Sequence, residues 1–256
     1  MTMILQRLNM DTSWWTELSS TRILVDPWLE GAEVDYAQWF NMQWHRTEPL
    51  PYSSLPAYDA VLITQKYADH CHEATLRRLQ PEVILAPESL ESRLRRWLPG
   101  VRLQLFGSDC REHRVGTLTV TQLPTRRRRD PIYDAFVLSD GAERLMIANH
   151  GFTLDEGHLA QLAPSGGCDV LLSPFNRYRL PTVLGGVVTP GLEGLRRLVE
   201  QLRPRSVIQT HDEDKHARGL IPRLATIDVF DREDTTDRPW LRDRIREVND
   251  YERCQP

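Results

Sequence analysis

The sequence predicts an α/β domain in which helices cover sheets, and three observations lead to this fold class. Apolar strand-like runs alternate with helix-like segments between residues 60 and 106. Consecutive strand-like runs then fill residues 110–150, and the alternation returns from residue 154. Such alternation is typical of layered α/β proteins. We expect residues 1–256 to form one such domain, since 256 residues are enough to bury its core.

The N-terminal region is predicted to begin with three short strands and to continue as a long loop. The strands are expected at residues 4–8, 13–18 and 22–27. Residues 28–58 show no apolar period, carry many aromatic side chains and end in a proline-rich stretch. We expect an aromatic loop here, which either walls a pocket or only anchors itself to the body.

Apolar runs and helical periodicity predict the remaining elements in chain order. Strands are expected at 60–64, 83–87, 101–106, 117–123, 133–138, 144–148, 169–173, 206–210 and 227–230. Helices are expected at 73–79, 89–98, 154–162, 190–202 and 219–225. Thr189 is the predicted N-cap of the fourth helix, with Pro190 at its first position. The charged tail, residues 232–256, is expected to form a last helix or to cover a sheet edge.

Composition limits the classes of partner and the compartment. The net charge is −4 and the isoelectric point about 6.1, which argues against a general nucleic-acid surface. No apolar run approaches the roughly 18 residues of a membrane span, and the N-terminus lacks the pattern of a signal peptide. Because the four cysteines are scattered, we expect a cytoplasmic protein. Nothing in the sequence indicates an oligomeric state.

Three histidines share one context, directly after a predicted strand. They are His70, His150 and His211. If the three strands belong to one sheet, the imidazoles meet at one rim. Asp69 adds a carboxylate, and this ligand set suits Zn, Fe, Mn or Ni. The pattern predicts a metal site of Asp69, His70, His150 and His211, although histidines also end strands without any metal.

Four short motifs carry a resemblance to a known family. Residues 24–28 read LVDPW, residues 64–70 read TQKYADH, residues 148–151 read ANHG and residues 208–212 read IQTHD. With these motifs the chain resembles metallo-β-lactamase-fold hydrolases, close in layout to lactonases and phosphodiesterases, from about Ser13 to His211. The resemblance implies a four-layer αββα sandwich with mixed sheets and a metal-dependent hydrolase.

The chain departs from the family pattern at the first of the family's two metal sites. In the family motif T-H-x-H-x-D-H, the first two histidines are replaced here by Gln65 and Tyr67. An arginine, Arg126 or Arg127, stands where the family has its third histidine. Gln and Tyr are weak ligands and an arginine repels metal, so we expect this site to be lost. Lys66 or an arginine could supply the missing positive charge.

The second metal site of the family is largely retained. Asp69, His70 and His211 match its ligands, and His150 stands where the family has a bridging aspartate. The resemblance therefore implies one divalent ion at these four residues, with zinc preferred over Fe, Mn or Ni.

Three functional hypotheses follow. In the first, the metal activates water against an ester, lactone or phosphoester of an anionic small molecule. Asp69 and Tyr67 then act in catalysis, with Tyr67 or an arginine of the run 126–129 stabilising the oxyanion. The acidic residues 212–214 are either proton carriers or a plain solvated loop. In the second hypothesis the fold remains but the metal is lost, and the protein binds a small anion or a protein partner.

A third hypothesis is contact with nucleic acid through Arg126–Arg129. The run is short and the net charge is negative, so a solvated or anion-facing loop is expected instead.

Overall fold

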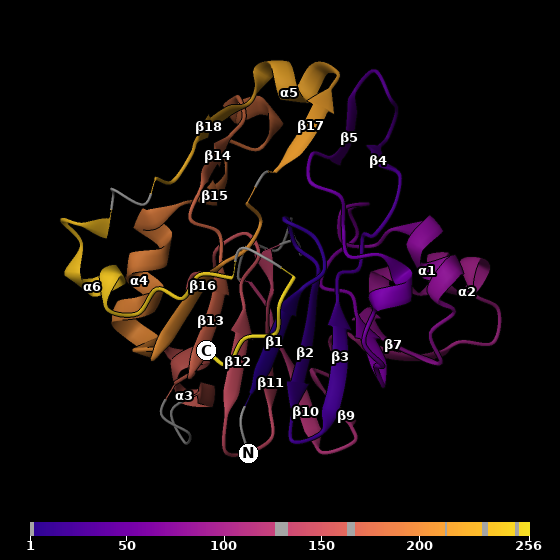
Figure 1. Cartoon of the computed structure of the whole chain (residues 1–256), viewed down its shortest axis with the longest axis horizontal. Coiled ribbons are helices and arrows are strands. Elements are labelled where there is room, and N and C mark those ends of the chain that lie inside the picture. The colour runs from indigo at the N-terminus through magenta and orange to yellow at the C-terminus, as the bar shows by residue number, and fades with distance from the viewer. Residues whose placement is uncertain (1–2, 126–132, 163–166, 213, 232–234, 249–250) are drawn as a thin grey trace.

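Two six-stranded sheets pack face to face between helices (Figure 1). The computed structural model describes residues 3–125, 133–162, 167–212, 214–231, 235–248 and 251–256. Its buried apolar side chains form one cluster between the sheets and one beneath the helices on each outer side. These layers are the four-layer αββα sandwich that the family resemblance implied, which is confirmed. The arginine run 126–129 lies outside the described residues.

The first sheet has the order β1-β2-β3-β6-β7-β8. Its strands are β1 (Ile4–Arg7), β2 (Trp14–Leu18), β3 (Thr21–Val25), β6 (Ala60–Leu62), β7 (Val83–Pro87) and β8 (Arg102–Phe106). The pairs among β1, β2 and β3 are antiparallel, and those from β3 to β8 are parallel. Strand β3 shows why its residues read as a continuous apolar run. Ile23 and Val25 face the second sheet while Leu24 faces the helices, so both faces are buried.

The second sheet has the order β16-β13-β12-β11-β10-β9. Its strands are β9 (Glu112–Val115), β10 (Leu118–Leu123), β11 (Ala135–Ser139), β12 (Arg144–Ile147), β13 (Val170–Ser173) and β16 (Ser206–Gln209). The β12–β13 and β13–β16 pairs are parallel and the others antiparallel. Mixed pairing in both sheets agrees with the predicted fold.

Helices cover the outer faces of both sheets. Those beside the first sheet are α1 (Glu73–Leu79) and α2 (Glu91–Trp97), and those beside the second are α3 (Glu156–Leu162), α4 (Leu192–Leu202) and α6 (Pro239–Arg242). Helix α4 begins with Gly191 as N-cap, so the predicted cap at Thr189 is wrong. Thr189 and Pro190 instead end a strand, where the Thr189 hydroxyl donates to the carbonyl of Asn176.

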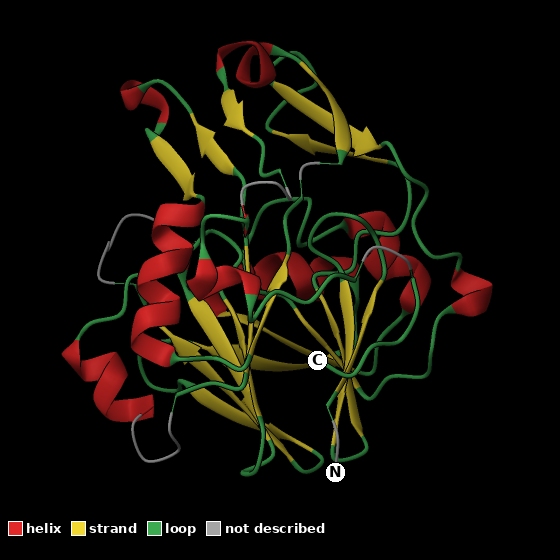
Figure 2. Cartoon of the chain, turned by 60° about the vertical axis from the view of Figure 1, so that its left-hand side comes forward, coloured by secondary structure: helices red, strands yellow, loops and turns green. Residues whose placement is uncertain are grey.

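A cap of two three-stranded sheets stands above the sandwich (Figure 2). One sheet has the order β17-β5-β4, formed by β4 (Ala32–Asp35), β5 (Asn41–His45) and β17 (Lys215–Arg218). The other has the order β15-β14-β18, formed by β14 (Arg177–Arg179), β15 (Val187–Pro190) and β18 (Thr226–Asp228). Helix α5 (Leu220–Leu224) connects β17 to β18 and so joins the two sheets. Residues 32–45, 177–190 and 215–229 are called the cap below.

The segment 28–58 was expected to be a loop, yet it contains β4, β5 and a 3-10 turn at Tyr52–Ser54. The usual strand signal is inverted here, since the polar side chains of β4 face inward. Glu33 is buried, whereas Val34 is exposed. An apolar period could not be seen because the buried face of this sheet is the polar one.

The expectation that the three histidine-bearing strands share one sheet is also wrong. Strand β6, which precedes His70, belongs to the first sheet, whereas β12 and β16, which precede His150 and His211, belong to the second. The sandwich brings the ends of both sheets to one rim, so the histidines meet across the interface. Within the part of the chain that is described, no helix is both long and apolar enough to cross a membrane.

Candidate metal centre

Three buried imidazoles converge at the rim between the two large sheets. His70, His150 and His211 each offer one ring nitrogen, and these nitrogens lie within 4.8 Å of one another. The ring centroids of His150 and His211 are 5.0 Å apart, and those of His70 and His211 are 5.6 Å apart. Segments far apart in the sequence thus deliver three potential ligands to one point.

His70 is held by a buried carboxylate. Its Nδ1 lies 2.7 Å from Oδ2 of Asp26, and both side chains are fully buried. Asp26 also accepts hydrogen bonds from the Thr64 backbone at 2.7 Å and from Nδ2 of Asn149 at 2.8 Å. This network keeps Nδ1 as the donor and turns Nε2 toward the cluster. Nε2 of His70 has no hydrogen-bond partner among the described residues.

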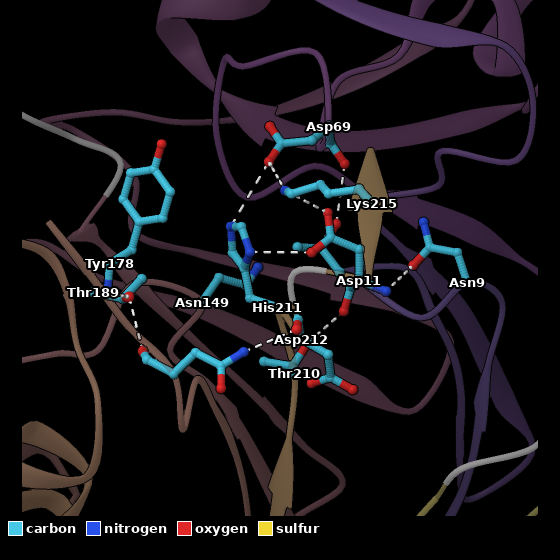
Figure 3. A network of polar contacts seen from close by, with 12 residues as sticks. Asn9, Asp11, Asp69, Asn149, Tyr178, Thr189, Thr210, His211, Asp212 and Lys215 are labelled. Carbon is cyan, nitrogen blue, oxygen red and sulfur yellow. Dashed lines mark hydrogen bonds and ion pairs between the residues drawn. The ribbon is translucent and has the colours of Figure 1, made fainter. Parts of the chain in front are cut away.

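His211 is held in a similar way by Asp11 (Figure 3). Oδ1 of Asp11 lies 3.1 Å from Nδ1 of His211, and the Asp11 carbonyl accepts the His211 backbone N–H at 2.9 Å. His211 adopts a φ of +58°, a left-handed conformation that is uncommon outside glycine and often occurs at functional sites. Burial alone would raise the pKa of Asp11, but the charges of Lys215 and His211 outweigh it and hold that pKa well below its usual value.

His150 has an amide as its partner. Nε2 of His150 lies 2.6 Å from the amide nitrogen of Gln65. The Gln65 amide N–H donates in this pair, and Nε2 of His150 accepts. Nδ1 of His150 has no hydrogen-bond partner among the described residues. Burial, followed by the charges of His211 and His70, holds the pKa of His150 well below its usual value, which favours the neutral, ligating form.

Asp69 lies beside two of the histidines. Its Oδ2 is 3.5 Å from Nε2 of His70 and 3.7 Å from Nε2 of His211. The ammonium of Lys215 is 3.8 Å from the same oxygen and 3.0 Å from Oδ2 of Asp11. Lys215 is therefore a buried cation of the site among the described residues, whereas the sequence suggested Lys66 or an arginine for this role. Lys66 instead stands over the ring of Tyr67, with its Nζ 5.3 Å from the ring centroid.

The donor set fits a divalent metal ion. Two imidazoles have a carboxylate at Nδ1, an arrangement that orients metal-binding histidines. The buried Nε2 of His70 and Nδ1 of His150 would otherwise remain desolvated without a partner, which is costly. Neutral imidazole with a nearby carboxylate suits zinc and its neighbours in the transition series.

A cavity of about 270 Å³ opens onto the cluster. Gln65, Tyr67, Asp69, His150, His211 and Lys215 line its floor, together with side chains of the cap. The two sheets of the cap give the cavity unlike walls. The β17-β5-β4 sheet contributes Asp35, Asn41 and Gln43, with Tyr36 and Phe40 from the turn between β4 and β5 nearby. The segment from β14 to β15 contributes Tyr178, Leu180, Leu184 and Val188. A substrate in this cavity meets one wall rich in polar groups and one that is mainly apolar.

Two carboxyl groups on the inner face of β4 border the site. Glu33 is buried, and neither of its oxygens has a hydrogen-bond partner among the described residues. Burial and the nearby Asp69 charge raise the pKa of Glu33 to about 10. Burial also raises the pKa of Asp35 to about 6. Glu33 is therefore protonated and neutral at pH 7.

The predicted residues separate into two groups. Asp69, His70, His150 and His211 lie together, and Tyr67 lines the same cavity. His72, two residues after His70, instead caps the N-terminus of α1, where its side chain accepts the Thr75 backbone N–H at 3.3 Å.

Two of the three acidic residues that follow His211 lie beside arginines. Asp212 pairs with Arg7 at 2.9 Å and Asp214 lies 3.9 Å from Arg46, while Glu213 lies outside the described residues.

Sequence reasoning missed Asp11 and Lys215, which secure His211. Asp11 lies in the turn after β1, and Lys215 opens a strand that no apolar period reveals. The one available signal was the position of Lys215, four residues beyond a strand-end histidine.

Comparison with known proteins identifies relatives of this architecture. The family model described as "Beta-lactamase superfamily domain" matches residues 9–211. No curated protein sequence matches the chain.

Several solved structures share the fold across the whole chain. An isothiocyanate hydrolase from Delia radicum gut bacteria is 18% identical, with a TM-score of 0.70 and 98% of each chain covered. A possible metal-dependent hydrolase from Veillonella parvula is 14% identical, with a TM-score of 0.70 and 100% of each chain covered. Igni18, a metallo hydrolase from Ignicoccus hospitalis, is 14% identical, with a TM-score of 0.67 and coverages of 99% and 98%. At these identities the likeness concerns the fold.

Proposed function

Because the chain belongs to the metallo-β-lactamase superfamily of metal-dependent hydrolases, we propose that it hydrolyses a small molecule with one bound divalent metal ion. The ligands in this proposal are His70, His150 and His211, with Asp69 as the fourth. The observation that carries it is the convergence of three buried imidazole nitrogens within 4.8 Å. Zinc is the first candidate, followed by Fe, Mn and Ni.

A metal ion held there supplies Lewis acidity, which lowers the pKa of water and polarises a carbonyl or phosphoryl oxygen. The protein residues supply position and charge. Asp26 and Asp11 fix the histidine rings, and Gln65 fixes His150. Asp69, which borders the cavity, is the candidate to orient the attacking water and accept its proton.

Lys215 and Tyr67 are the candidates for stabilising the negative charge that develops on the substrate. Both line the cavity, and an ammonium in a site largely shielded from water acts strongly on such a charge. The same ammonium supports the expectation of an anionic or oxygen-rich substrate, namely an ester, a lactone or a phosphoester. The four cysteines are free, which fits the predicted cytoplasmic location.

A second candidate function is binding without a metal. The ammonium of Lys215, 3.8 Å from Asp69, already provides a positive charge beside the histidines. In that case the cavity would bind a small anion, or the protein would bind a partner, without catalysis.

Metal content separates the two functions. We expect about one ion per chain in protein supplemented with Zn, Fe, Mn or Ni, measured by mass spectrometry of the elements. The ion should be lost in His70→Ala/His211→Ala and retained in the control His216→Ala, because His216 is exposed on β17. A chain that takes up no metal under any of these conditions contradicts the hydrolase and favours the binding protein. Retention of the ion in His150→Ala would remove His150 from the ligand set.

A further inference from the structure

Exposed apolar side chains gather on the cap. Throughout the described residues, every exposed large hydrophobic side chain belongs to it: Val34, Tyr36, Trp39, Val183, Leu184, Val187, Leu220, Leu224, Ile227 and Val229. The exposure is substantial, at 80% for Tyr36, 71% for Trp39 and 91% for Val183. Single exposed apolar residues are ordinary, but a gathering in one region marks a contact surface.

This surface continues into the cavity. Tyr36 and Leu184 are exposed and also line the cavity, one from each side of the cap. The backbone N–H of Leu220 donates to the carbonyl of Trp39 at 2.9 Å, which seats α5 on the turn between β4 and β5. Ile221 of the same helix also lines the cavity. The apolar surface therefore extends from the mouth to the inner apolar wall.

The cavity has a limited size. Its volume of about 270 Å³ lies near the lower end of the roughly 300–1,000 Å³ that is usual for small-molecule sites. A substituent too long for such a site leaves through the mouth, where Tyr36 and Leu184 are exposed.

We propose, on the basis of the proposed hydrolase function, that the substrate is an amphiphile whose apolar chain lies along the cap. The polar head sits on the floor near Asp69 and Lys215. The alkyl, acyl or arylalkyl chain runs past Leu184 and Tyr36 onto the exposed surface. Polar and apolar groups of such a molecule match the two walls of the cavity.

Binding of alkylphosphonates with four, eight and twelve carbons tests the proposal. Calorimetry below the micellar concentration should show the Kd falling about two- to fourfold for each added methylene that is buried. The double variant Tyr36→Asn/Leu184→Ser should flatten this dependence on chain length. Asparagine is chosen because residue 36 has a φ of +63°, which asparagine tolerates.

The matched control is Ile227→Ser/Val229→Ser, which changes two exposed cap residues that do not line the cavity. It should retain the chain-length dependence. An affinity that does not change with chain length in the unaltered protein overturns the proposal.

Two other occupants of the surface would also overturn it. One is a second copy of the chain, seen as a dimer in sedimentation that the control variant dissociates. The other is a bilayer, seen as sedimentation with phosphatidylcholine vesicles that the control variant abolishes.

The dependence of the alkylphosphonate Kd on chain length is the same whether or not a metal holds the phosphonate head. Measurements with and without a chelator therefore test the amphiphile separately from the hydrolase. Loss of metal content with the slope intact contradicts only the proposed reaction.

Discussion

The Asp26 carboxylate lies 2.7 Å from Nδ1 of His70, and solvent reaches neither side chain. Asp26 is on the turn after β3, and His70 follows the neighbouring strand β6. The pairing of two adjacent parallel strands thereby sets the direction of a candidate metal ligand.

Asp26→Asn should lower metal affinity about ten- to hundredfold, because His70 loses the carboxylate that orients its ring. Competition with a chromogenic chelator measures the change. Asp59→Asn is the control, since Asp59 is exposed and its carboxylate accepts the Arg22 backbone N–H at 2.8 Å. Equal affinities of the two variants would show that the Asp26–His70 contact does not support metal binding.

Glu33→Gln should stabilise the metal-free protein at pH 7.5 and leave its stability unchanged near pH 4. The folded-state pKa of about 10 exceeds the ordinary value of 4.5. Between these values the unfolded chain releases a proton that the folded protein keeps, so stability falls as pH rises. The gain at pH 7.5 should be roughly 1–4 kcal/mol in urea unfolding.

The control for this pH dependence is Glu112→Gln, an exposed glutamate on β9. A gain for Glu33→Gln that is the same at pH 4 and pH 7.5 would argue against a buried neutral Glu33.

Lys215→Met should lower the free energy of unfolding by about 3–5 kcal/mol, since it leaves Asp11 charged and buried without the ammonium 3.0 Å away. The double variant Asp11→Asn/Lys215→Met should be more stable than Lys215→Met alone, because the buried carboxylate that lost its ammonium is gone. A double-mutant cycle in urea measures this coupling. Additive effects of the two substitutions would mean that the pair is energetically independent.

Gly219→Ala should destabilise the protein by at least about 1 kcal/mol and loosen α5. Residue 219 has a φ of +119°, and an added Cβ would lie 2.6 Å from the carbonyl oxygen of Phe40. Gly185→Ala is the matched control, with a φ of +124° and open space around the added carbon. Thermal unfolding measures the stability of both variants. Equal losses of stability would show that the close approach of the added Cβ to Phe40 contributes nothing.

Many strands of the sandwich could be predicted because they carry local signals, whereas its four-layer arrangement was implied by the family resemblance. Strands β3, β6, β7 and β13 are buried on both faces and read as apolar runs. Helix α1 spans the predicted residues 73–79. Its C-cap, Gln80, has a left-handed conformation. In the cap, the strand predicted at 227–230 overlaps β18, whereas β4 was missed because its buried side chain is the polar Glu33.

Part of the site was predictable for a similar reason. A histidine after a buried strand is visible in the sequence, which singled out His70, His150 and His211, although they meet across two sheets and not at the rim of one. The contact of Asp11 with Lys215 joins residues that are 204 positions apart in the sequence, and no local sequence pattern indicates it. Contacts of this kind depend on the whole fold and therefore required the structure.

The ribbon from β17 through α5 to β18 belongs to both sheets of the cap. One wall of the cavity therefore cannot shift alone, because a displacement of β17 pulls on β18 through a single short helix. Lys215, at the start of this ribbon, is tied to Asp11 and thereby to His211. A molecule that spreads the mouth would apply force to a ring of the histidine cluster, so entry and ligand geometry are mechanically linked.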